Sequence, residues 1–210
     1  MLAASSGHER AVKLLLRRGA EINLQNSSGG TALMAAAVFG HERVIEMLLR
    51  HSAQVDTQDS EGGTPLMCAA QEGHERVVDL LLRHGPEVNL QKSDGGTALM
   101  LAADYGHERV VELLIRRGAE INLQRSDGYT ALMRAAVFNR SAVVRRLLRA
   151  GADTAARSSL GKTAPQMAKE KGHAECVEAF RQHVAEVTTG RREAAAGGTG
   201  GASSGEAGAG

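Results

Sequence analysis

The chain repeats itself at a fixed interval of 33 residues through its central part. The signature T-A-L-M or T-P-L-M begins at Thr31, Thr64, Thr97 and Thr130, and a degraded copy, T-A-P-Q, begins at Thr163. A unit of this length is too small to bury its own apolar face, so the copies must stack and share a core between neighbours. The period therefore predicts an elongated solenoid with a long surface rather than a closed catalytic pocket.

Within one unit, the pattern predicts two short helices that are separated by a glycine and followed by a loop. Thr64 suits a helix N-cap and Pro65 suits the first helical position, where a missing N–H costs nothing. The second helix is expected to end at a glycine such as Gly85, which adopts the left-handed C-cap conformation most easily. One stripe of the second helix has apolar residues at helical spacing and must be buried: Val44, Ile45, Leu48 and Leu49.

Further motifs recur in phase with the threonine signature. They are a pair of alanines in the first helix, the motif G-H-E-R at Gly40, Gly73 and Gly106, and a pair of β-branched residues in the second helix. Together these motifs closely resemble the ankyrin repeat family, over residues 1 to about 187. The resemblance implies an all-α fold, an ankyrin-repeat solenoid of stacked helix-turn-helix units. It also implies that loops such as 89–96 form short β-hairpin fingers.

The two ends depart from the repeat in different ways. Residues 1–30 form a truncated first repeat that lacks the threonine signature, residues 31–162 form four full repeats, and residues 163–187 form a C-terminal capping repeat. In the capping repeat Pro165 and Arg181 replace leucines, which predicts a solvated outer face. Residues 188–210 are rich in Gly, Ala and Ser and are expected to be a disordered tail. Whether repeats precede Met1 is left open.

Composition favours an intracellular module. The chain is 42% hydrophobic but only 2% aromatic, and its two cysteines, Cys68 and Cys176, are expected to be reduced thiols. We find no secretory signal, and the longest apolar run, residues 32–39, is too short to span a membrane. We therefore expect a cytoplasmic or nuclear protein with no membrane partner.

No residue constellation in the sequence predicts catalysis. Five histidines occupy the same slot of successive units, but units lie about 8–10 Å apart, so these side chains cannot converge on one metal ion. We expect each to form a local hydrogen bond at the start of a second helix. No catalytic motif is present, so we expect no enzyme activity, no catalytic or metal site and no cofactor. The histidines are His8, His41, His74, His107 and His173.

The resemblance also implies where a partner binds: at the finger tips and at the exposed ends of the first helices. Four of the five aromatic residues fall at such positions, and exposed aromatic side chains are typical binding anchors. The alternative is that Phe39 and Phe138 only cover the ends of helix pairs. Among the candidates, three charged residues are expected to set the charge preference: Glu72, Asp104 and Lys162. The complete set of candidate partner-binding residues is Phe39, Glu72, Asp104, Tyr105, Tyr129, Phe138 and Lys162.

Two weaker signals concern the loops and the charge. A serine ladder and a glutamine ladder, the latter including Gln25 and Gln58, run along the fingers and suit either turn chemistry or contacts with an extended polypeptide. Residues 130–162 contain seven basic residues against Asp153 alone, a local net charge of +6 in a chain of net charge +1. This patch is suited to an acidic partner, or to arginines that favour the helix dipole.

The sequence therefore predicts a non-enzymatic scaffold or adaptor that binds a protein or peptide in a concave groove. The partner is expected to be acidic towards the C-terminal repeats, the chain to be a monomer, and nucleic acid not to be a ligand. The alternative is an ankyrin adaptor fragment of a larger multidomain protein whose activity lies outside this chain.

Overall fold

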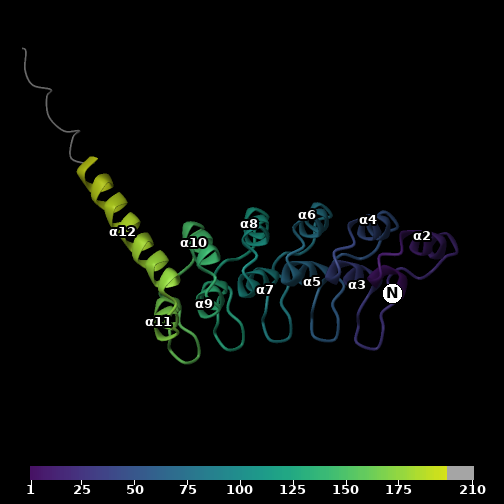
Figure 1. The fold of residues 1–210 in the computed structure, drawn as a ribbon, viewed down its shortest axis with the longest axis horizontal. Coiled ribbons are helices and arrows are strands. Elements are labelled where there is room, and N and C mark those ends of the chain that lie inside the picture. The colour runs from purple at the N-terminus through teal and green to yellow at the C-terminus, as the bar shows by residue number, and fades with distance from the viewer. Residues whose placement is uncertain (198–210) are drawn as a thin grey trace, which may run out of the picture.

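The computed structural model describes residues 1–197, in which twelve α-helices form six consecutive pairs (Figure 1). The first helices of the pairs are α1 (Leu2–Ser5), α3 (Ala32–Val38), α5 (Pro65–Glu72), α7 (Ala98–Tyr105), α9 (Ala131–Val137) and α11 (Ala164–Glu170). The second helices are α2 (Glu9–Arg17), α4 (Glu42–Arg50), α6 (Glu75–Arg83), α8 (Glu108–Arg116), α10 (Ser141–Arg149) and α12 (Ala174–Gly197). The all-α repeat solenoid predicted from the 33-residue period is confirmed.

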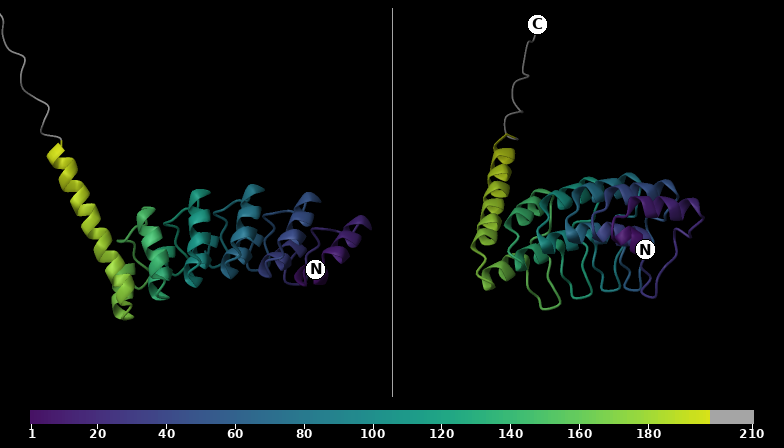
Figure 2. Two further views of the ribbon diagram at one scale, coloured as in Figure 1. Left: turned by 45° about the horizontal axis from the view of Figure 1, so that its top comes forward. Right: turned by 45° about the vertical axis from the view of Figure 1, so that its right-hand side comes forward.

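The helices form two rows. The first helices make an inner row and the second helices an outer row, and the loops that connect successive pairs hang from the inner row (Figures 1 and 2). Each inner helix from α3 to α9 packs against the inner helices of both neighbouring pairs, as α5 does against α3 and α7. The loops occupy the place of the expected fingers, but the described residues contain no strand, so the fingers are turns rather than regular β-hairpins.

In the full repeats, the sequence predicts the residues that start the inner helices and those that end the outer helices. The side-chain oxygen of Thr64 accepts a hydrogen bond from the backbone N–H of Met67 at 3.3 Å, and the equivalent threonines of the three other full repeats do the same. Pro65 occupies the first helical position. After the second helix, Gly85 has φ +69°, the left-handed conformation expected of a C-cap. These residues mark the start of α5 and the end of α6.

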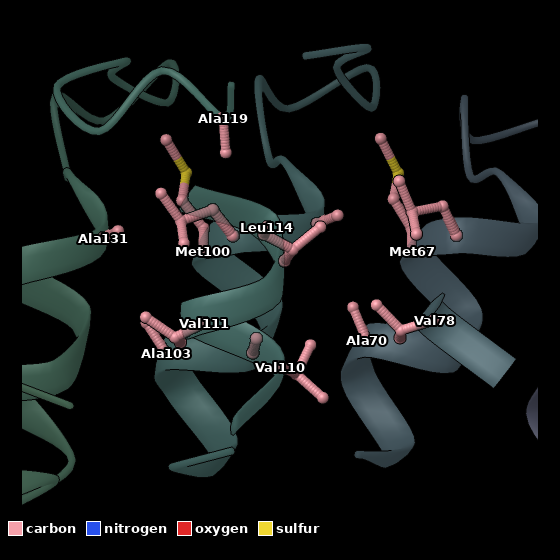
Figure 3. Close-up of a cluster of buried hydrophobic side chains, with 14 of the residues drawn as sticks. Met67, Ala70, Val78, Met100, Ala103, Val110, Val111, Leu114, Ala119 and Ala131 are labelled. Atoms are coloured by element: carbon pink, nitrogen blue, oxygen red, sulfur yellow. The ribbon is translucent and has the colours of Figure 1, made fainter. Parts of the chain in front are cut away.

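The core lies between neighbouring units rather than inside any one of them. Alanines such as Ala70 and Ala103 are fully buried, and their small side chains allow adjacent inner helices to approach closely. Met67 and Met100 occupy equivalent places one repeat apart, point the same way and are 3% exposed (Figure 3). Their flexible apolar side chains fill the gap between the inner and outer rows.

The repeated histidines tie each unit to the one before it, which corrects the expectation of a local hydrogen bond. Nε2 of His74 donates to the backbone carbonyl of Val38 at 2.9 Å, across 36 residues. The same bond joins His41 to Ser5 and His107 to Gln71, each at 2.8 Å. The last carbonyls of an inner helix have no partner within the helix, and the next unit is close enough to supply one.

The close approach of each histidine depends on the glycine before the preceding outer helix. A side-chain carbon on Gly40 would stand 2.8 Å from the ring of His74, which is too close. Gly40 also has φ +71°, a backbone conformation that residues other than glycine rarely adopt. Asn139 occupies the equivalent place in the next-to-last unit, with φ 58°. There His173 donates through Nδ1 instead, to the carbonyl of Ala136 at 2.9 Å.

The glutamine ladder holds the fingers together. Nε2 of Gln25 donates to the carbonyl of Gly29 in its own finger at 2.7 Å and to the carbonyl of Gln58 in the next finger at 3.0 Å. The backbone N–H of Ser60 donates to the carbonyl of Ser28 at 2.9 Å, and later fingers repeat this bond. These hydrogen bonds stabilise the turns of the fingers, which is one of the two roles expected for the ladders. They also connect neighbouring fingers into one surface.

The two ends differ from the middle of the stack. Leu15 on α2 is 48% exposed, whereas its equivalents in the four full repeats are at most 3% exposed. At the other end, α12 continues to Gly197 and leans away from the stack (Figure 1). Residues 188–197, where a disordered tail was expected, are part of this helix, and R-R-E-A-A-A at 191–196 is a strong helix-forming sequence. Residues 198–210 of the expected tail lie outside the described residues.

Candidate partner-binding surface

The ends of the inner helices carry a row of large side chains that we call the aromatic ladder: Phe39, Glu72, Tyr105 and Phe138. They stand at the same position of four successive repeats, at or just after the last residue of α3, α5, α7 and α9. Phe39 is 59% exposed, Tyr105 53% and Phe138 43%, and Glu72 is also exposed. About half of each aromatic side chain is therefore exposed to solvent.

The rings of the ladder rest on rigid neighbours. The Phe39 ring stacks on the ring of His41 and the Tyr105 ring on that of His107, with centroids 6.2 Å apart in both cases. Each of these histidines is itself bonded to the preceding repeat. The third ring, Phe138, lies under the guanidinium of Arg134, whose carbon is 4.9 Å from the ring centroid. The ladder is thus held in place before any partner arrives.

Asp104, which was expected to help set the charge preference for a partner, is paired with Arg134 in the structure. Asp104 is only 9% exposed. Its carboxylate accepts hydrogen bonds from both Nε and Nη2 of Arg134, the Nε bond at 2.5 Å. This hydrogen bond to Asp104 is the main cause of the raised pKa of Arg134. The two residues form a two-point ion pair with no net charge, and its guanidinium lies over the Phe138 ring.

Arg134 is the residue of this surface that sequence reasoning missed. It was counted only as part of the basic patch, although it shapes the ladder directly. The sequence contains a signal for this contact: an acid, Asp104, and a base one repeat later, Arg134, both depart from the residues usual at their positions of the repeat. The equivalents of Arg134 are Ala35, Cys68 and Leu101. Because the partners are 30 residues apart, no local pattern reveals that they meet.

The two finger candidates lie apart from the ladder. Tyr129 precedes α9 and Phe138 follows it, so the seven residues of this helix, or roughly 10 Å along its axis, separate them. Tyr129 is half-buried and packs against the core. Nζ of Lys162 lies 2.5 Å from Oε2 of Glu170, so its charge is partly satisfied. The structure therefore separates the sequence candidates into two rows at opposite ends of the inner helices.

The basic patch at residues 130–162 is less basic in the structure than in the sequence. Arg134 pairs with Asp104, and Arg146 lies 3.1 Å from Glu112 on the preceding repeat. The side chain of Glu112 is only 10% exposed, and its carboxylate also forms ion pairs with Arg109 and Arg116. Charge counted along one repeat misses these contacts because the acids that neutralise it come from the repeat before.

Three further observations bear on the chemistry of the chain. In residues 1–197, no group of three or more His, Cys, Asp or Glu side chains is placed to hold a metal ion. No helix in this same region is both long and apolar enough to cross a bilayer. Cys68 and Cys176 are free thiols, and burial raises the pKa of both, that of Cys68 to about 11.

The family follows from comparison with known sequences as well as from this architecture. The family model for ankyrin repeats in three copies matches residues 1–92 and again residues 84–158. This match covers most of the chain, which belongs to the ankyrin repeat family. Members of this family are in general protein–protein interaction modules and are typically not enzymes. No curated protein matches the chain in a direct sequence search.

Proposed function

We propose that this chain is a non-enzymatic scaffold or adaptor that binds a protein or peptide across the concave side of its inner helices, with the aromatic ladder as the contact. The observation that carries the proposal is the exposure of Phe39, Tyr105 and Phe138 on one row of a rigid stack. Exposed aromatic side chains give large contact area for little loss of conformational entropy. Because the ladder is already ordered by its neighbours, binding needs little rearrangement.

The spacing of the ladder sets a pattern for the partner. Successive repeats lie about 8–10 Å apart, which is roughly three residues of an extended chain at about 3.3 Å each. Tyr105 and Phe138 occupy adjacent repeats, so an extended partner would place two apolar side chains about three residues apart. Glu72 lies one repeat further and Phe39 two repeats further. The partner would therefore carry a basic residue and then a third apolar residue at the same interval.

Charge supports a partner of mixed sign. Glu72 is exposed, and within residues 1–197 its carboxylate accepts one hydrogen bond, from its neighbour Gln71, so it suits a basic side chain. Arg145 and Arg149 lie on the outer helix α10, so they act on a partner at the inner helices through the longer-range field of the more positive C-terminal half. A partner that is acidic towards the C-terminal repeats fits this arrangement. We further propose that the chain acts as a monomer in the cytoplasm or nucleus, and that nucleic acid is not its ligand.

The test compares the native chain with a Phe39→Ala, Tyr105→Ala, Phe138→Ala variant in a pull-down with quantitative mass spectrometry. All three side chains are about half exposed, so the thermal midpoint of the variant should stay close to the native one. A Leu14→Ala variant provides the control, because Leu14 is 55% exposed on the outer helix α2. Partners retained by the control and lost by the ladder variant support the proposal. Partners retained by both variants would contradict it.

A further inference from the structure

The outer face of the last repeat carries a hollow that a capping repeat does not need. It lies between α11 and α12 and has a volume of about 520 Å³, within the range of roughly 300–1,000 Å³ of clefts that bind ligands. Pro165, Val177 and Val184 supply its apolar lining, and Phe180, only 6% exposed, closes its floor. The solvated outer face predicted for this repeat is therefore interrupted by an apolar area, which we call the end hollow.

The equivalent positions elsewhere in the stack are covered by helices. Pro165 is equivalent to Leu132 and Val177 to Val144, and in the fourth full repeat these residues are 1% and 0% exposed beneath the following helix pair. In the last repeat the same positions are partly open. The end hollow is therefore the surface on which a further repeat would pack. In this protein, helices cover such surfaces.

The apolar surface also extends along α12, beyond the end hollow. Val177, Phe180, Val184 and Val187 follow one another at intervals of three, four and three residues and so lie along one side of the helix. Val184 is 59% exposed and Val187 45%. From Val177 to Val187 the stripe is about 15 Å long at 1.5 Å per residue. A small molecule in the hollow would leave Val187 uncovered, whereas a helical segment lying beside α12 covers the whole stripe.

Two cations border this surface and restrict what can cover it. Lys169 and Arg181 line the end hollow at positions where the preceding repeat has Ala136 and Leu148. Burying them beneath an apolar helix pair would leave two charges without partners, which is costly. Within the described residues, Arg181 has one carboxylate nearby, Glu178 at 3.9 Å, at the limit of an ion pair. A covering helix must therefore bring its own carboxylates.

The same charge argument disfavours a second copy of this chain. The exposed N-terminal face, which would be the natural continuation of the stack, includes Leu14 and Leu15 on α2. That helix and its C-cap also carry a set of basic residues that would approach Lys169 and Arg181. They are Arg10, Lys13, Arg17 and Arg18.

We propose that the end hollow and the adjoining stripe of α12 form a second binding surface, whose occupant is an acidic amphipathic helix of another protein. The apolar face of that helix would cover Val177, Val184 and Val187, and its flanking carboxylates would meet Lys169 and Arg181. This surface is separate from the aromatic ladder, so a ligand at one leaves the other free.

The test selects peptides of about 16 residues, or roughly 24 Å as helices, from a displayed random library on the full chain. Binders to a Val184→Asp variant are removed first. The proposal expects enriched peptides with large apolar residues at intervals of three and four, flanked by Asp or Glu. As synthetic peptides they should bind the native chain roughly tenfold more tightly than Val184→Asp or Lys169→Glu/Arg181→Glu variants.

Two controls separate this surface from others. Leu24→Asp alters a side chain of matched exposure, 58%, in the first finger, and should leave peptide binding unchanged, as should the triple alanine variant of the ladder. No enrichment, enriched peptides without acids, or equal binding to the charge-reversed variant would overturn the proposal. Self-association in light scattering that is abolished by Val184→Asp would also overturn it, because the occupant would then be a second copy.

Discussion

Replacing His74 with alanine tests whether the repeated histidines hold successive units together. The substitution removes the 2.9 Å hydrogen bond to the carbonyl of Val38 and the packing of the ring over Gly40. Loss of one such bond costs about 0.5–1.5 kcal/mol, and a partly buried carbonyl left without a donor adds to this. We therefore expect His74→Ala to lower the free energy of unfolding by about 1–2 kcal/mol. For a chain of this size that is a fall in Tm of roughly 2–8 °C.

The protein itself supplies the matched control for this experiment. Arg140 occupies the histidine slot of the fourth full repeat and donates from Nε to the carbonyl of Asp104 at 2.9 Å. A His74→Arg variant retains a donor and should stay within about 0.5 kcal/mol of the native chain, the usual scatter of neutral substitutions. Urea unfolding followed by circular dichroism measures both variants. If His74→Arg lost as much stability as His74→Ala, or if His74→Ala lost none, the inferred role of the hydrogen bond would be wrong.

Three other outcomes follow from the geometry. Arg134→Ala, which leaves the carboxylate of Asp104 buried without its partner, should cost about 2–4 kcal/mol in urea unfolding, and Arg134→Ala/Asp104→Ala should cost less than the sum of the single variants. At position 139, where φ is positive, stability should fall in the order Gly, Asn, Ala, with Asn139→Ala about 1 kcal/mol below Asn139→Gly in the same assay. Because burial, and secondarily the charge of Asp59, raises the pKa of Cys68 from 9.0 to about 11, native Cys68 should react with a thiol reagent at pH 8 far more slowly than in denaturant. The raised pKa favours the protonated native state, so its contribution to stability is complete below pH 9 and is lost as the pH rises through 11, and Cys68→Ala should flatten that part of the stability profile.

The sequence was sufficient for everything that depends on contacts within one unit. The threonine caps, the proline at the first helical position and the glycine after the second helix act on their own neighbours, so a single repeat contains the information. The apolar stripe of α4 was likewise readable from helical spacing, and Val44, Ile45 and Leu48 are at most 3% exposed. The period of 33 residues predicted that the units stack on one another.

Most differences from the sequence-based expectations concern partners in another unit, or the length of a helix, which the 33-residue period does not set. The acceptor of His74 lies 36 residues away, and the acid that neutralises Arg134 lies 30 residues away. Each residue looks unpaired when its own repeat is read alone. Helix α12 continues past the expected boundary at residue 188 because local helix propensity, rather than repeat packing, sets its end. For the candidate surface, the sequence located the aromatic ladder but not the ion pair between two of its rings.

The histidine contacts make the N-terminal units exchangeable. His41, His74 and His107 each lie over a glycine and bond a carbonyl of the preceding unit in the same way. Deleting residues 64–96 would join residue 63 to residue 97 and bring His107 over Gly40, in the place that His74 now holds. The surface can thus be shortened or lengthened by whole units at these junctions. The junction at Asn139 uses different chemistry, because His173 bonds the carbonyl of Ala136 through Nδ1, so the last unit does not match these exchangeable junctions.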